Sequence, residues 1–569
     1  MSKVRIEVVR AALNRSKAST DYKIYDTPYK RQEFRKQLIL ADNTLTEDEK
    51  TEAMGKIDMK YDKYNVLQNK GTKRICENCN KECLATLYCE YCIRNYLEAK
   101  FSNWTSGNDD IDNLIQKCQM ETLKPSVIIE WIPYNKLENI KYLTKGGFAE
   151  IYSAIWIGGK YKVWNSKEQK LDRSGRDIKV ILKRLENVEN ATRHWFEEAK
   201  THLAISNKYT EIVQCYGLTQ DPLNKDYMLV MFKMDVDLRK YLQQNHNQLT
   251  WKVRISIIYG IIQSLNKIHN ENIIHRDLHS GNILYSNLNQ NWYVSDLGLC
   301  GPVNKPIKSI YGNLPYIAPE VISGEQTTKA SDIYSFAMLM WEISSGQPPF
   351  FKHEHDYNLV INIINGIRPI VVSGTPLEYK NLMVQCWDAD PSKRPDAHSL
   401  FKKFREINFS YQNMSNESFQ PLITNSIEMK ESDFTNTYSK LFTSKVYQFE
   451  NFPEPRNATE EEQEVFHSKP HDFHIPDNID DFDKSNNQGS SSTSTIINNF
   501  EDNNKNFLTK FNELQINSEN DTQNDYIKEI TMQQQIKKLH TDINDEDDIC
   551  NNPNFHSDEQ NEFEIPDDI

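Results

Sequence analysis

Long apolar runs are missing from this sequence of 569 residues. The longest candidate, Ile255 to Ile262, is interrupted by polar residues and Gly260, and it falls far short of the roughly 18 residues that span a bilayer. The first residues, MSKVRIEVVRAALNRSK, also lack the apolar centre of a signal peptide. These absences predict a soluble protein without a transmembrane segment. We expect it to be intracellular and cytoplasmic, with a nuclear location left open.

Apolar residues are also scarce in the C-terminal third, where Asn, Ser, Asp and Glu are abundant. Residues 411–569 carry 33 acidic and 11 basic side chains, whereas the formal net charge of the whole chain is −14. A segment with few apolar residues and a high net charge buries too little surface to offset the entropy lost on folding. We therefore predict a disordered, acidic, Asn/Ser-rich tail over 407–569. The aromatic residues in 439–470 indicate either a docking motif for protein partners or a linker.

The N-terminal region has the opposite charge, because the first 40 residues hold ten Lys or Arg and four Asp or Glu. Patchy helical spacing predicts a loosely helical, basic region over 1–70. Its charge fits contact with nucleic acid or an acidic membrane, or else an ordinary solvated surface. We favour the solvated surface and expect no nucleic-acid partner.

A disulfide framework is not expected, because ten cysteines in a large intracellular chain point to metal ligands or free thiols. Two CxxC pairs, Cys76 with Cys79 and Cys89 with Cys92, enclose nine residues that include Cys83. Four thiolates at this spacing suit tetrahedral Zn²⁺, which would organise a segment that lacks a large core. We predict a zinc-knuckle-like module and a helical linker over 71–125, which could also dock protein partners. The alternatives are a reduced, metal-free segment or a redox pair, with Cys83 as a spare thiol or an alternate ligand.

From Trp131 the chain changes to short β-rich runs joined by Gly and Asn turns, with one helical segment around 192–205. After residue 235 the pattern is mostly helical to about residue 405. A small β-rich lobe followed by a larger helical lobe is an α+β arrangement. The cleft of such an arrangement is a natural ligand site.

Five short motifs follow one another in this part of the chain: KGGFAEIY from Lys145, VILK ending at Lys183, HRDLHSGN from His275, DLG from Asp296 and APE ending at Glu320. In order and spacing they resemble the signature set of eukaryotic protein kinases, over residues 130–406. The residues around HRDLHSGN and YIAPE look most like the tyrosine-kinase-like group. The cysteine module and the sequence SNWTSGN resemble a kinase set expanded in certain fungi. The resemblance implies the two-lobed protein-kinase fold, with a small β-rich N-lobe and a larger helical C-lobe.

The resemblance also implies an ATP- and Mg²⁺-dependent phosphotransferase. Asp296 and Asn282 would hold Mg²⁺, because this hard cation prefers carboxylate and amide oxygens. Asp277 would orient the substrate hydroxyl and accept its proton, and Lys183 would contact the α- and β-phosphates of ATP. Phosphoryl transfer depends on positioning and charge neutralisation more than on covalent chemistry, which explains the need for these residue types.

The supporting residues follow from the same resemblance. Glu198 would hold the catalytic lysine from a helix, with its neighbour Glu197 as the alternative. Glu320 would pair with a buried Arg394, and Asp332 would brace the backbone of the catalytic loop. The pairing of Glu320 with Arg394 and the bracing by Asp332 hold the fold, and they therefore support the fold more than the activity.

The phosphate-binding loop departs from the family pattern. Of its three usual glycines only Gly146 is present, with Thr144 at the first position and Ala149 at the third. A Cβ at Ala149 costs about 1 kcal/mol of backbone freedom, so we expect weakened but not abolished ATP binding. The residues implied in nucleotide binding are Thr144, Lys145, Gly146, Gly147, Phe148, Ala149, Ile151, Lys183, Met231, Lys233 and Met234.

Two further departures concern the acceptor. His279 stands where serine/threonine kinases usually have a lysine near the transferred phosphate, and Asn313 stands where they have a threonine. His279 either contacts that phosphate or only fills space in the loop. Arg276 would bind a phosphate on the activation segment, which the resemblance places from Asp296 to Glu320. Ser309 and Tyr311 are the candidate phosphosites unless they are ordinary loop hydroxyls.

The sequence therefore predicts an active, regulated protein kinase in intracellular signalling, which transfers the γ-phosphate of ATP to protein hydroxyls, on serine or threonine. A pseudokinase scaffold is the main alternative, although all four catalytic residues are present. A zinc-dependent nucleic-acid binder that carries a kinase domain is a third reading, and it depends only on the basic N-terminus.

Overall fold

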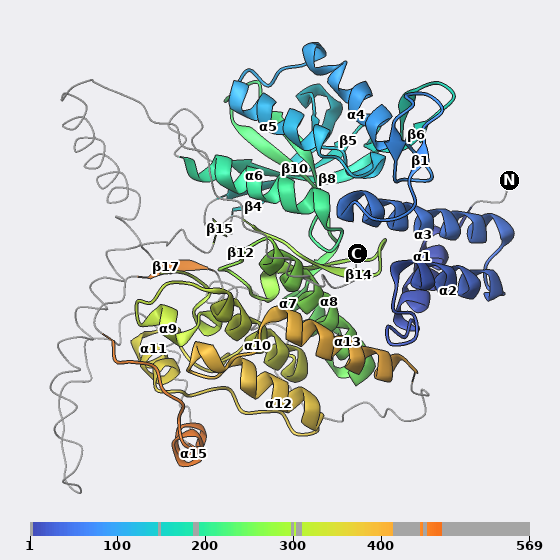
Figure 1. Ribbon diagram of the computed structural model, residues 1–569. Helices are drawn as coiled ribbons and strands as arrows, with labels where there is room; N and C mark the ends of the chain where they lie inside the picture. The colour runs from blue at the N-terminus through green and yellow to red at the C-terminus, as the bar shows by residue number, and fades with distance from the viewer. Residues whose placement is uncertain are drawn as a thin grey trace, which may run out of the picture. The chain divides into compact units, whose positions relative to one another are not determined.

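A six-stranded sheet forms the N-lobe, in the order β3-β9-β10-β8-β5-β4 (Figure 1). Only β3 and β9 run parallel, and the other neighbours are antiparallel. The computed structural model describes residues 4–145, 149–185, 193–297, 301–302, 310–413, 444–447 and 452–468. The strands of this sheet are β3 (Glu130–Trp131), β4 (Leu137–Lys145), β5 (Ala149–Trp156), β8 (Ile178–Leu185), β9 (Cys215–Gln220) and β10 (Tyr227–Phe232).

Strand β10 is apolar along its whole length because both of its faces are covered. Leu229 and Met231 point to a cluster shared with helix α6 (Arg193–Lys208), whereas Met228 and Val230 point to a second cluster across the sheet. Successive side chains of a strand alternate between its faces, so a strand buried on both sides reads as an unbroken apolar run. The β-rich run predicted here is therefore a central strand.

Helix α5 (Asp109–Met120) covers α6 and the same face of the sheet. Its four apolar positions at helical spacing are all buried in the shared cluster: Ile111, Leu114, Ile115 and Cys118. The Tyr227 hydroxyl donates to the Ser106 carbonyl oxygen at 3.0 Å and fixes the approach to the helix. The predicted helical linker is thus a packed part of the N-lobe.

The cysteine module contains the short hairpin β1 (Arg74–Ile75) and β2 (Glu82–Cys83) and helix α4 (Glu90–Glu98). It packs against an excursion between β5 and β8, the hairpin β6 (Tyr161–Asn165) and β7 (Lys170–Arg173). Trp164 and Leu171 of that hairpin are buried in one cluster with the module's cysteines. Residues 71–125 are therefore joined to the N-lobe by a common apolar core.

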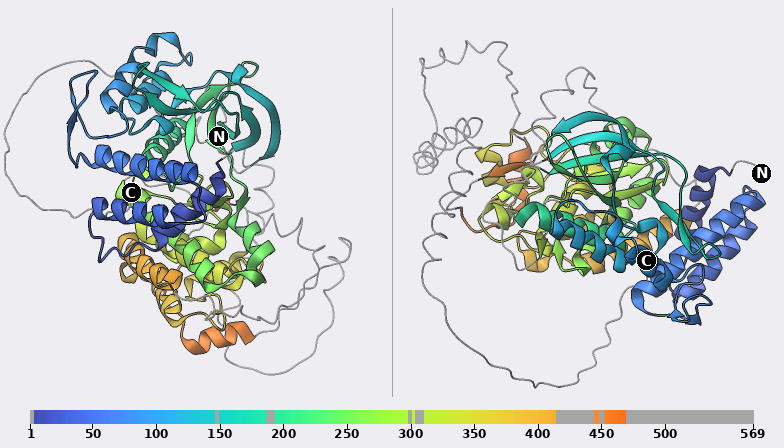
Figure 2. Two further views of the ribbon diagram at one scale, coloured as in Figure 1. Left: turned by 90° about the vertical axis from the view of Figure 1, so that its right-hand side faces the viewer. Right: turned by 90° about the horizontal axis from the view of Figure 1, so that it is seen from above.

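The basic N-terminal region forms three helices that lie together in every view (Figures 1 and 2). Val9, Ile39 and Ala53, one from each helix, are almost fully buried in their shared core. A capping box at Thr46 begins the third helix. Among the described residues, no helix is long and apolar enough to cross a membrane. The three helices are α1 (Ile6–Ala18), α2 (Pro28–Ala41) and α3 (Glu47–Gln68).

The C-lobe is mostly helical, as predicted. The apolar run from Ile255 lies within α8, whose side chains are largely buried and which packs along α13. Small strand pairs precede and follow the catalytic motifs: β11 (Val236–Asp237), β12 (Ile273–Ile274), β13 (Ile283–Ser286), β14 (Asn291–Val294), β15 (Gly301–Pro302) and β16 (Ile310–Gly312). The helices are α7 (Leu238–Asn245), α8 (Trp251–Asn270), α9 (Pro319–Ile322), α10 (Lys329–Ser345), α11 (Tyr357–Ile364), α12 (Leu377–Cys386) and α13 (Ala397–Asn413).

The C-terminal tail differs in part from the expected disordered segment. Helix α13 continues to Asn413, and two tail segments contact the C-lobe: strand β17 (Lys445–Tyr447) and the stretch 452–468 with helix α15 (Glu460–Ser468) (Figure 1). Strand β17 pairs with β16, and the Gln463 side chain donates to the Gly366 carbonyl oxygen at 2.8 Å. These contacts depend on tertiary surfaces that composition alone does not reveal.

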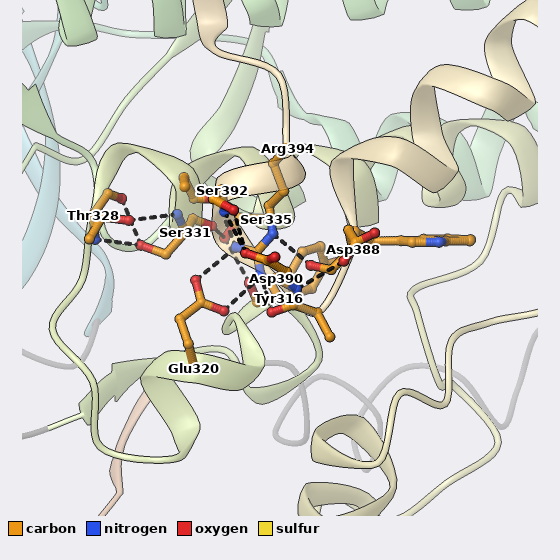
Figure 3. A network of polar contacts seen from close by, with 12 residues as sticks. Tyr316, Glu320, Thr328, Ser331, Ser335, Asp388, Asp390, Ser392 and Arg394 are labelled. Atoms are coloured by element: carbon orange, nitrogen blue, oxygen red, sulfur yellow. Dashed lines mark hydrogen bonds and ion pairs between the residues drawn. The ribbon is translucent and has the colours of Figure 1, made fainter. Parts of the chain in front are cut away.

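A buried ion pair joins the APE motif to the segment before α13 (Figure 3). Both terminal nitrogens of Arg394 donate to Glu320, each at 2.7 Å, and the Arg394 side chain is fully buried. Arg394 also donates to the carbonyl oxygens of Asp388 and Ala330 at 2.8 and 2.9 Å. A bidentate pair with satisfied neighbours fixes two loops in one geometry.

We expect Arg394→Ala to lower the free energy of unfolding by about 3–5 kcal/mol, because it leaves the Glu320 carboxylate buried without its partner. Lys403→Ala is the matched control, since the side chains of Lys403 and its partner Glu378 are about half exposed. That change should cost at most about 1 kcal/mol. Urea denaturation of the full chain measures both, and equal losses would contradict a structural role for the buried pair.

Candidate functional site

The catalytic loop is held by a buried carboxylate. Asp332 in α10 accepts hydrogen bonds from the backbone N–H groups of His275 and Arg276, at 2.8 and 2.9 Å. Arg276 has a φ of 71°, a left-handed conformation that persists only where the surroundings enforce it. The next residue is Asp277, whose own N–H donates to Nδ1 of His275 at 3.3 Å. Asp332 thereby fixes the backbone conformation just before Asp277, and with it the direction of the Asp277 side chain.

Asn282 lies beside Asp277, as the resemblance implies. Its side-chain nitrogen donates to the backbone oxygen of Asp277 at 2.9 Å and lies 3.5 Å from the carboxylate. The backbone oxygen of Asn282 accepts from both the N–H and the hydroxyl of Ser295, at 2.8 and 2.9 Å. Because Ser295 precedes Asp296, these bonds hold Asn282 and Asp296, the two predicted magnesium ligands, next to each other.

Lys183 and Asp296 form an ion pair across the two lobes, with Nζ 2.8 Å from Oδ1. Lys183 lies in β8 opposite Ile151 of β5, so the lysine comes from the middle of the sheet. Asp296 has a φ of 52° and a side chain that is 46% exposed. An exposed carboxylate beside a lysine provides both an oxygen ligand for a divalent cation and a cation for phosphate.

Most of the predicted nucleotide-binding residues lie on strands of this sheet or directly beside them. Thr144 and Lys145 end β4, Ala149 begins β5, and Met231 lies near the end of β10, followed by Lys233 and Met234. Three predicted residues lie outside the described part of the chain: Gly146, Gly147 and Phe148. Glu198 belongs to α6, as does Glu197, but the side chains of both fall outside the described residues.

His279 has contacts on both ring nitrogens. Its Nδ1 accepts from the Gly281 N–H at 3.1 Å and caps the turn of Ser280 to Asn282. Its Nε2 lies 3.2 Å from the hydroxyl oxygen of Ser444 and 3.6 Å from Asp277. The Nδ1 contact shows that the histidine fills space in the loop, and its contact with the transferred phosphate stays a prediction.

The two candidate phosphosites are described only in part. Ser309 lies outside the described residues, and Tyr311 belongs to β16 by its backbone. Asn313, the residue at the usual threonine position, is almost fully buried at the end of this strand. The expected phosphate contact of Arg276 stays a prediction.

A buried polar network beneath the loop was not found from the sequence. The Tyr316 hydroxyl donates to Glu342 at 2.6 Å and lies 3.4 Å from the Ser280 hydroxyl, which accepts from Arg239 at 3.2 Å. Burial raises the pKa values of Glu342 and Tyr316. Nothing in the local sequence marks Glu342, because its partners Tyr316 and Arg239 belong to other parts of the chain.

The four cysteines of the two CxxC pairs converge in one cluster. Their sulfur atoms all lie within 4.8 Å of one another, with Cys76 to Cys92 and Cys79 to Cys89 both at 3.6 Å. Tetrahedral zinc with Zn–S bonds of about 2.3 Å requires sulfur atoms about 3.8 Å apart, so this donor set fits the ion. Cys83 is outside this group of four and lies instead near Cys89 and Glu90.

Comparison with known proteins also identifies the two lobes as a protein kinase domain. The family model for protein tyrosine and serine/threonine kinases matches residues 137–404. The serine/threonine-protein kinase VIK of Arabidopsis thaliana is 30% identical over 285 residues, which are 47% of this chain and 59% of the relative. The dual specificity protein kinase zakA of Dictyostelium discoideum is 30% identical over 203 residues, 33% of this chain and 26% of the relative. The chain thus spans less than two thirds of either relative's length.

Proposed function

We propose that this chain, whose residues 137–404 are a protein kinase domain, transfers the γ-phosphate of ATP to serine or threonine hydroxyls of proteins. The observation that carries the proposal is the assembly of Asp277, Asn282, Lys183 and Asp296 around one site. A pseudokinase would be expected to lack one or more of these groups, and this chain has all four with their supporting contacts.

In this mechanism each side chain has a separate task. Asp277 receives the proton of the acceptor hydroxyl and aims its oxygen at the γ-phosphorus. Asn282 and Asp296 would hold Mg²⁺, which would neutralise phosphate charge. Lys183 exchanges its carboxylate partner for the phosphates of ATP, and this keeps the nucleotide in line with the acceptor.

The proposed preference for serine or threonine rests on how far the acceptor hydroxyl lies from its own backbone. The Ser444 hydroxyl lies 2.9 Å from the Asp277 carboxylate while the adjoining backbone pairs with β16. A tyrosine at this position would carry its hydroxyl beyond Asp277, because an aromatic ring separates the oxygen from the backbone. The name of VIK agrees with this preference, and the name of zakA includes both acceptor classes.

We assign the domain to the tyrosine-kinase-like group, on the sequences from His275 to Asn282 and from Tyr316 to Glu320. Binding of further protein partners by the cysteine module stays a prediction, as does cytoplasmic localisation.

Asp277→Asn should lower turnover on serine peptides by about 100-fold or more, because the general base is lost, while ATP binding persists. Asp296→Asn should abolish Mg²⁺-supported transfer with the fold intact. Asp110→Asn, at an exposed position in α5, is the matched control and should leave turnover unchanged. Rates are measured with labelled ATP and matched serine, threonine and tyrosine peptides. Full turnover in both variants would refute the kinase mechanism, and preference for tyrosine peptides would refute the acceptor class.

We further propose that Cys76, Cys79, Cys89 and Cys92 bind one structural Zn²⁺, on the fit between the sulfur separations and the tetrahedral ion. The ion would stabilise the apolar core shared by the cysteine module and the β6–β7 hairpin.

Elemental analysis of full-length protein expressed with zinc supplied should find one zinc ion per chain. Cys92→Ser should lose the metal, whereas Cys83→Ser, at a neighbouring buried cysteine outside the group of four, should retain it. Metal-free protein with a folded cysteine module would contradict the zinc assignment.

A further inference from the structure

The tail places a serine hydroxyl on the catalytic carboxylate. Ser444 Oγ lies 2.9 Å from Oδ1 and 3.1 Å from Oδ2 of Asp277, and 3.2 Å from Nε2 of His279. Ser444 is separated from Asp277 by 167 positions, so this contact is purely tertiary. It is the contact that an acceptor hydroxyl requires before its proton is removed.

The hydrogen-bond pattern orients this hydroxyl for transfer. Because Nδ1 of His279 accepts from the Gly281 N–H, the neutral ring carries its proton on Nε2. Nε2–H then donates to Ser444 Oγ, and the serine proton is directed to Asp277. One oxygen lone pair of Ser444 is left for the phosphorus, and the group that would accept the proton is already in contact.

The backbone next to Ser444 is held as an added strand. In the antiparallel pair of β17 and β16, Lys445 lies opposite Gly312 and Tyr447 opposite Ile310. Gly312 of β16 has a φ of 146°, a backbone conformation that residues with a side chain rarely adopt, so glycine suits this position opposite the added strand. Strand addition is a general mode of peptide recognition, with affinity from the backbone and selectivity from side chains.

The following segment, 452–468, anchors this strand to the C-lobe. The Asn457 side chain accepts from the Ala389 N–H at 2.9 Å and donates to Asp388 at 3.0 Å. The backbone N–H of Arg456 donates to the Ile364 carbonyl oxygen at 3.1 Å. Farther along, the rings of Phe466 and His353 stack with their centroids 5.0 Å apart. An anchor so close in sequence to Ser444 raises the local concentration of the acceptor at the site.

We propose that Ser444 is a phosphorylation site of this chain, modified by the chain's own kinase domain in an intramolecular reaction. The inference rests on the proposed function, because it uses ATP and the same catalytic groups. Ser444 Oγ forms the new bond to the γ-phosphorus of ATP as the bond from that phosphorus to the β-phosphate oxygen breaks. Asp277 takes the hydroxyl proton, and the products are phosphoserine 444 and ADP.

The test incubates the full-length protein with ATP and Mg²⁺ and follows phosphate at Ser444 by mass spectrometry. We expect complete modification, at a first-order rate that stays constant over a wide range of protein concentrations. Ser444→Ala should remove this phosphate, and Ser468→Ala, at the other serine of the described tail segments, should leave it in place. An absence of phosphate at Ser444, or a rate that rises in proportion to protein concentration, would overturn intramolecular transfer.

Three variants examine the acceptor and the anchor. Ser444→Thr should remain an acceptor and Ser444→Tyr should not, because the tyrosine hydroxyl lies beyond Asp277. Asn457→Ala should slow modification of Ser444 by about tenfold through the lower local concentration, with kcat on a separate serine peptide unchanged. Equal modification rates with and without the anchor contact would count against delivery by the tail.

The outcome separates this inference from the kinase assignment itself. Transfer to a serine peptide without transfer to Ser444 overturns the intramolecular site and leaves the proposed function standing. Absence of transfer to both acceptors overturns both proposals.

Discussion

The carboxylate of Asp332 is the constraint on which the active geometry depends. It is almost fully buried and accepts hydrogen bonds from His269 and from the backbone of His275 and Arg276, all between 2.8 and 2.9 Å. Burial by itself would raise the pKa of Asp332, but these donors and nearby histidines lower it, so the charged form is favoured. A buried charge with satisfied acceptors can enforce a strained backbone, and here the strain lies one residue before Asp277.

Two further buried groups extend this constraint to the surrounding loops. The bidentate contact between Arg394 and Glu320 fixes the end of the activation segment. The hydrogen bond from Tyr316 to Glu342 supports the catalytic loop. Each is polar, buried and paired, so its geometry is specific in a way that apolar packing alone is not. The exposed carboxylate of Asp296, in contrast, remains accessible for ligand exchange.

The regions outside the two lobes are structurally coupled to them. Helix α5 and the cysteine module share apolar cores with α6 and with the β6–β7 hairpin, and tail residues pair with β16 beside the catalytic carboxylate. The tail is the most direct of these connections, because its anchoring segment, 452–468, lies close in sequence to Ser444.

The sequence by itself predicted the order of the lobes and the side chains that we expect to be catalytic. Lys183, Asp277 and Asp296 stand in short motifs whose spacing is tied to local strands and turns, so they could be found without coordinates. The convergence of the cysteine pairs was also predictable, because CxxC spacing brings two thiols together locally. Only the tertiary structure decided which distant surfaces meet. Glu342 and Ser444 carry no local signal, since their roles arise from hydrogen bonds to residues far away in the chain. Composition reports the mean tendency of a segment to fold, and it cannot reveal a single strand that is ordered by pairing with another part of the protein.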